Sequence, residues 1–97
     1  MNIIKLINDN QYSIEQKLTG HNGEVLNVIE IRENELISVS YDKTMKKWEK
    51  KNNKFEITKT IDFQNSNSWC NILKLNENEF ITYSYSDKCL KFWNSNN

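Results

Sequence analysis

Length, composition and charge set narrow limits on this chain. Its 97 residues, 37% of them hydrophobic and 27% charged, suit one small domain or part of a larger one. Thirteen basic residues balance thirteen acidic ones, so no net charge attracts nucleic acid or an anionic membrane. A single histidine and two cysteines, Cys70 and Cys89, supply neither a histidine-rich metal site nor a disulfide framework. The early apolar stretch from Ile3 to Ile7 is too short for a signal or membrane-spanning segment, so we expect an intracellular protein, cytoplasmic or nuclear.

The hydrophobic pattern predicts strands in chain order. Short runs rich in β-branched and aromatic residues occupy 25–31, 35–41, 44–48 and 55–63. Clusters of Asn, Asp and Ser separate the runs, and these residues must form the turns because the chain has two glycines and no proline. Strands spaced in this way, with turns between them, predict an all-β sandwich, barrel or propeller.

An internal repeat is visible in the sequence. Residues 31–48 align with residues 75–93 if one residue is inserted near Ser86. The aligned segments share identical residues at ten positions, and their final tryptophans, Trp48 and Trp93, are 45 residues apart. A period of about 40–45 residues built from short strands is the length of one propeller blade.

These residues carry a family resemblance. Gly20-His21, followed by Val25 and Val28 and then by the run from Ser38 to Glu49, resembles a WD repeat. The family pattern opens with Gly-His and closes with Ser-x-Ser-x-Asp-x-Thr-Ile-x-x-Trp-Asp, where this chain has Glu49 in place of the last Asp. The second copy departs further. It has Asn65 where the family has histidine, and Asn94 follows Trp93.

The resemblance implies an all-β fold, an open β-propeller fragment with four-stranded antiparallel blades. It divides the chain into strands c and d of a partial blade in 1–18, a full repeat in 19–63, and a repeat without its last strand in 64–97. The expected strands are 3–8, 12–18, 24–31, 35–41, 44–50, 54–63, 69–75, 79–85 and 89–94. Closed propellers hold about four to eight blades. Two blades leave open apolar faces, rich in Val25, Val28, Ile29, Ile72 and Leu73, so we expect either further blades from a parent chain or self-association.

The family's structural tetrad maps onto four residues of the first repeat. His21, Asp42 and Trp48 fill three positions, and Ser38 fills the hydroxyl position, with Ser40 as the second choice. The second repeat retains Thr82, Asp87 and Trp93. A Ser, His and Asp set could instead form a hydrolase site using His21 and Asp42. No nucleophile-elbow or oxyanion-hole sequence accompanies it, so we expect the structural role and no enzyme.

The implied function is a non-catalytic scaffold that binds other proteins through loops at one end of the sheets. The expected partner-binding residues are Glu24, Leu26, Tyr41, Ser68, Cys70 and Ser86. A purely structural segment, with binding residues elsewhere, is the alternative. No Gly-rich phosphate loop, Cys-x-x-Cys pair or calcium-loop spacing occurs, so we expect no cofactor, no metal, and neither nucleic acid nor a membrane as partner.

Overall fold

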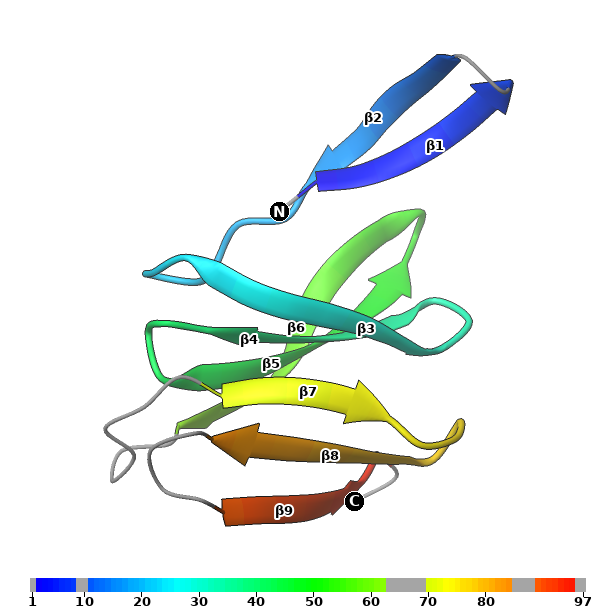
Figure 1. Ribbon diagram of the computed structural model, residues 1–97. Coiled ribbons are helices and arrows are strands. Elements are labelled where there is room, and N and C mark those ends of the chain that lie inside the picture. Colours follow the sequence, from blue (N-terminus) through cyan, green and yellow to red (C-terminus); the bar gives the residue numbers. More distant parts are fainter. Residues whose placement is uncertain (1, 9–10, 63–69, 85–88, 96–97) are drawn as a thin grey trace.

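The computed structural model describes residues 2–8, 11–62, 70–84 and 89–95 (Figure 1). These residues form nine strands and no helix, which confirms the all-β class. The strands are β1 (Asn2–Asn8), β2 (Gln11–Lys17), β3 (Val25–Arg32), β4 (Glu35–Ser40), β5 (Thr44–Lys51), β6 (Lys54–Asp62), β7 (Cys70–Lys74), β8 (Glu79–Ser84) and β9 (Cys89–Asn94). Each begins and ends within one residue of the expected range. The described residues accordingly contain no helix that could cross a membrane.

The strands form three antiparallel sheets in which chain neighbours pair. A hairpin of β1 and β2 comes first, then a four-stranded sheet in the order β3-β4-β5-β6, then a three-stranded sheet in the order β7-β8-β9. Figure 1 shows the hairpin reaching away from the other two sheets, which stack on one another. In the four-stranded sheet, β4 is the most deeply buried strand.

Asparagine makes the tight turns, as the composition predicts. Asn34, Asn52 and Asn53 adopt positive φ angles of 64°, 52° and 66°, and Lys43 has a φ of 67°. Asparagine tolerates this left-handed region better than most residues because its side chain can hydrogen-bond to the nearby backbone. These turns fix the registers of the β3-β4, β4-β5 and β5-β6 pairs.

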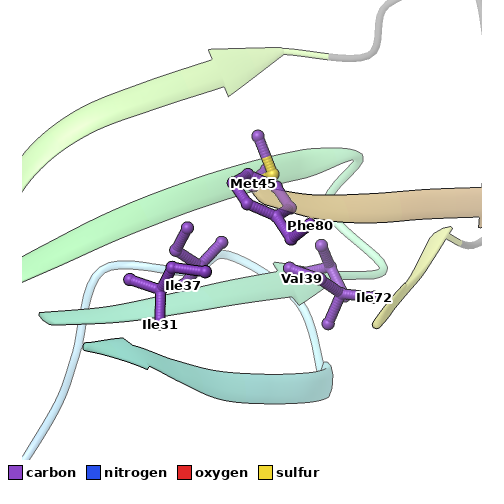
Figure 2. Close-up of a cluster of buried hydrophobic side chains, with 6 residues drawn as sticks. All are labelled: Ile31, Ile37, Val39, Met45, Ile72 and Phe80. Atoms are coloured by element: carbon purple, nitrogen blue, oxygen red, sulfur yellow. The ribbon is translucent and has the colours of Figure 1, made fainter. Parts of the chain in front are cut away.

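The main hydrophobic core lies between the two stacked sheets (Figure 2). The four-stranded sheet contributes Ile31, Ile37, Val39 and Met45, and the three-stranded sheet contributes Ile72 and Phe80. All six are at most 4% exposed. Full burial of one such side chain stabilises a fold by about 1.5–3 kcal/mol, so this cluster is the principal attachment between the sheets.

Each stacked sheet has two distinct faces, set by the two-residue alternation of strands. The tryptophan face of the four-stranded sheet carries Val28, Leu36, Ser38 and Trp48, and that of the three-stranded sheet carries Ile72, Phe80, Thr82 and Trp93. The opposite, aliphatic face carries Ile29, Ile37, Val39 and Met45 in one sheet, and Leu73, Ile81, Leu90 and Phe92 in the other. The core joins the aliphatic face of the first sheet to the tryptophan face of the second.

A second cluster covers part of the tryptophan face of the four-stranded sheet. Leu18, which follows β2, packs with Leu36 and Trp48, and Phe55 lies against them. Among the residues expected on open faces, Ile72 is instead buried between the sheets at 4% exposure, whereas Val28 is 39% and Leu73 is 54% exposed.

Candidate functional site

The candidate site joins two loops at one end of the four-stranded sheet. His21 lies in the segment between β2 and β3, and Asp42 lies in the turn between β4 and β5. The Nδ1 atom of His21 is 2.9 Å from Asp42 Oδ2. Their side chains are only 3% and 9% exposed, so the contact is largely shielded from water.

Ser38 and Trp48 extend this contact into the sheet. The indole Nε1–H of Trp48 donates to Ser38 Oγ at 2.9 Å, and Ser38 Oγ lies 2.7 Å from His21 Nε2. With Asp42 ionised, His21 Nδ1–H donates to the carboxylate, and the serine hydroxyl donates to Nε2. This assignment leaves each of these polar groups with a partner in a neutral histidine tautomer.

The Asp42 carboxylate collects further hydrogen bonds from its own turn. Oδ2 accepts from the backbone N–H of Asn22 at 2.9 Å, and Oδ1 accepts from the backbone N–H of Thr44 at 2.9 Å and from the Thr44 hydroxyl. Burial raises the pKa of this carboxyl, but the hydrogen bonds from Thr44, His21 and the two backbone groups favour the charged form more strongly. The net result is a pKa well below the ordinary range of aspartate.

Thr44 is a further member of this network that was not expected from the sequence, and Ser40, expected only as the second choice for the hydroxyl position, takes a different place in it. The Thr44 hydroxyl also lies 3.1 Å from His21 Nδ1. The sequence did contain a signal for Thr44. It lies two residues after Asp42, and an aspartate side chain in a turn commonly accepts a hydrogen bond from the backbone N–H two residues further on. Ser40 does not contact His21. Its hydroxyl donates to the carbonyl of Gly23 at 3.2 Å and accepts from Asp42 N–H at 3.1 Å, which ties the two loops together.

The three-stranded sheet carries a reduced version of the site. Trp93 Nε1–H donates to Thr82 Oγ1 at 2.8 Å, and the Trp93 ring stacks on Phe80 with centroids 6.2 Å apart. The only histidine of the chain is in the first repeat, so no imidazole can join this pair. Asp87 lies outside the described residues.

Two of the expected partner-binding residues lie together on the surface beside the first network. Glu24 is exposed, Tyr41 is 44% exposed, and the Tyr41 N–H donates to the Glu24 carbonyl at 2.9 Å. Leu26 is half-buried and packs against the main core. Ser68, Ser86 and the side chain of Cys70 lie outside the described residues.

The geometry limits the chemistry of the network. Ser38 is 0% exposed and His21 is nearly covered, so a substrate would reach neither unless the loops opened. Among the described residues, no group of three or more His, Cys, Asp and Glu side chains could hold a metal ion. The arrangement is suited to holding the 18–24 loop against the turn between β4 and β5.

The cysteines are on non-adjacent strands. Cys70 pairs across the sheet with Ser84, and Ser84 pairs with Cys89. Two strand spacings separate the cysteine backbones by about 9–10 Å, and a disulfide requires Cα atoms closer than about 7 Å. This register excludes a disulfide between the two cysteines.

Comparison with known protein families, curated proteins and solved structures finds no match for this chain.

Proposed function

We propose that this chain is a segment of a WD-repeat β-propeller that acts as a non-catalytic scaffold for binding other proteins. Three features support the proposal: antiparallel sheets in which chain neighbours pair, their face-to-face stacking, and a network linking His21, Ser38, Asp42 and Trp48 at the positions implied by the family resemblance. The sheets would serve as blades and their connecting loops as the binding surface.

The observation that carries the proposal is the set of hydrogen bonds to Asp42 that holds the loop containing Glu24 against the turn containing Tyr41. Asp42 receives hydrogen bonds from the 18–24 loop, through His21 and Asn22, and this holds that loop against the turn that contains Tyr41. A loop fixed before binding loses little conformational entropy when a partner docks. An exposed tyrosine on such a rigid loop is a residue type enriched at interface hot spots.

The same hydrogen-bonded network weighs against the hydrolase alternative. In the tautomer assigned above, the Ser38 hydroxyl accepts from Trp48 and donates to a histidine that is itself held by Asp42. A nucleophile needs open access to the reacting carbonyl, and Ser38 is fully buried. The exposure of Tyr41 favours binding over a purely structural role, in which no loop side chain would need to face a partner.

Site-specific photo-cross-linking tests the proposal. A photoreactive residue at position 41 should form a discrete adduct with a partner in an extract of the cells that contain this protein. The same residue at position 58, an exposed site on β6 away from these loops, is the control and should not form that adduct. Glu24→Lys should reduce the adduct at position 41, whereas the exposed Glu56→Lys should leave it unchanged. Equal adducts from positions 41 and 58, or none from position 41, would overturn the proposal.

A further inference from the structure

One surface of the three-stranded sheet is unusually apolar. Its aliphatic face exposes Leu73 by 54%, Leu90 by 62% and Phe92 by 72%, and Leu75 beside it is 47% exposed. Leu73 pairs across the sheet with Ile81, and Ile81 pairs with Phe92, so these side chains share one face. A contiguous exposed apolar patch of this kind marks an interaction surface.

The chain itself shows what covers such a face. The corresponding face of the four-stranded sheet holds Ile37 and Met45, which are only 2% and 4% exposed. They are covered by the tryptophan face of the next sheet, through Ile72 and Phe80. In the repeat, Ile37 corresponds to Ile81 and Met45 to Leu90. The occupant expected on the exposed face is therefore another sheet that presents a tryptophan face.

A tryptophan face with an open side is present in the same chain. Val28 of the four-stranded sheet corresponds in the repeat to Ile72, yet Val28 is 39% exposed where Ile72 is 4% exposed. Leu18 and Phe55 cover the tryptophan of this face but leave the β3 side open. Ile57 is also 39% exposed. Each chain thus carries one exposed aliphatic face and one half-open tryptophan face.

A pair of asparagines gives the stacking a direction. Asn27 Nδ2 donates to Asn71 Oδ1 at 2.7 Å, which joins β3 to β7. Each asparagine also accepts from the next backbone N–H, of Val28 and Ile72 respectively, at 2.8 Å. Asn71 holds the same position in the three-stranded sheet as Asn27 holds in the four-stranded sheet. An Asn71 amide could therefore donate to Asn27 Oδ1 of a following sheet in the same way.

From these complementary faces we propose that the protein associates with itself head to tail. The aliphatic face of the three-stranded sheet of one copy, with Leu73, Leu90 and Phe92, packs on the Val28 side of the four-stranded sheet of the next copy. The contact repeats the sheet stacking inside the chain. It is heterologous, so it produces closed rings or open filaments and not only dimers. The formal net charge of zero offers little repulsion against it.

Two face-blocking variants of the full chain test this proposal in sedimentation velocity at micromolar concentrations. Phe92→Lys places a charge on the aliphatic face, and Val28→Lys places one on the tryptophan face. The unmodified chain should form species larger than a dimer, and each variant alone should remain monomeric. An equal mixture should form a complex of two chains and nothing larger, because the one open face of each variant fits the open face of the other.

Two controls are needed. One distinguishes loss of association from misfolding, and the other distinguishes self-association from the proposed binding of other proteins. Circular dichroism and melting curves must show both variants folded, because only then does loss of association report on the faces. Glu24→Lys alters an exposed loop residue outside both faces. It should keep the assembly while reducing the cross-linked adduct at position 41, so the two proposals can fail separately.

Three results would overturn head-to-tail association. The first is an unmodified chain that stays monomeric throughout the concentration range. The second is a Val28→Lys variant that assembles like the parent while Phe92→Lys does not, which would indicate pairing of two aliphatic faces. The third is a mixture of folded variants that contains only monomers.

Discussion

The indole N–H of Trp48 donates to the hydroxyl of Ser38 at 2.9 Å, from β5 to β4. The same contact recurs between Trp93 and Thr82 at 2.8 Å in the three-stranded sheet. The two hydroxyls differ in the number of side chains they contact. Ser38 Oγ is also 2.7 Å from His21 Nε2, whereas Thr82 has no imidazole to meet. Removing these hydroxyls therefore takes a hydrogen-bond partner from different numbers of groups.

Ser38→Ala should destabilise the protein more than Thr82→Val. The serine change deprives both the Trp48 indole and the His21 ring of a partner, and the threonine change deprives only the Trp93 indole. Each buried group left unsatisfied costs about 1–3 kcal/mol. Urea denaturation followed by fluorescence gives both free energies of unfolding. Equal losses for the two variants would mean that the histidine contact adds nothing to stability.

His21→Ala should lower the free energy of unfolding by about 1–3 kcal/mol, because Ser38 and Asp42 both lose a buried partner. The matched control is Asn22→Ala. Asn22 contributes its backbone N–H to Asp42, and its side chain is exposed, so this change should be nearly neutral. A melting curve for His21→Ala that coincides with that of the parent would contradict the structural role of the network.

Stability should depend on the ionisation of Asp42. Hydrogen bonds hold the pKa of this carboxyl in the folded protein below its value in the unfolded chain. The unfolded chain therefore binds a proton first as the pH falls, and the stabilisation is fully present only above the unfolded pKa of about 3.9. It is lost progressively as the pH falls from there toward the folded pKa.

Asp42→Asn measures this contribution. The variant should be less stable than the parent near neutral pH, and the difference should shrink as the pH falls below about 4. Urea unfolding at several pH values determines the difference, with the exposed Asp62→Asn as the control for general charge effects. A difference between parent and Asp42→Asn that stays constant across this pH range would show that ionisation of Asp42 does not stabilise the fold.

Much of the fold was predictable because its determinants are local. Alternating β-branched residues and asparagine-rich turns specify where strands begin and end, and all nine strands match to within one residue. The family resemblance, rather than the pattern itself, indicated which hydroxyl, carboxylate and indole should be considered together. It placed Ser38 ahead of Ser40 for the hydroxyl position but did not show what Ser40 contacts, since both lie on β4 and only the turn geometry directs Ser40 toward Gly23.

Features that depend on contacts between sheets were not predictable. The burial of Ile72 and the exposure of Val28 differ although the two residues hold the same place in the repeat. Which of them is covered depends on what lies against each sheet, and the pattern within a strand does not contain that information. The Asn27–Asn71 contact also joins residues 44 positions apart. Their equal positions in the two repeats were the only available signal.

Gly20 occupies a site where a side chain meets both a steric and a backbone penalty. Its φ is +152°, a conformation that residues with a Cβ rarely adopt. A Cβ at this position would lie 2.5 Å from Ile57 Cδ1 and 3.5 Å from Trp48 Cη2. Gly20→Ala should therefore destabilise the protein by more than about 1 kcal/mol. It should also disturb the adjoining His21.

Ile57→Val separates the two penalties because valine lacks the Cδ1 atom that the new methyl group would strike. Ile57 is 39% exposed, so the valine change alone should cost little. In the double variant, the steric part of the Gly20→Ala cost should be recovered and the backbone part should remain. A double-mutant cycle from urea unfolding measures this coupling. Additivity to within about 0.5 kcal/mol would show that Ile57 does not exclude a side chain at position 20.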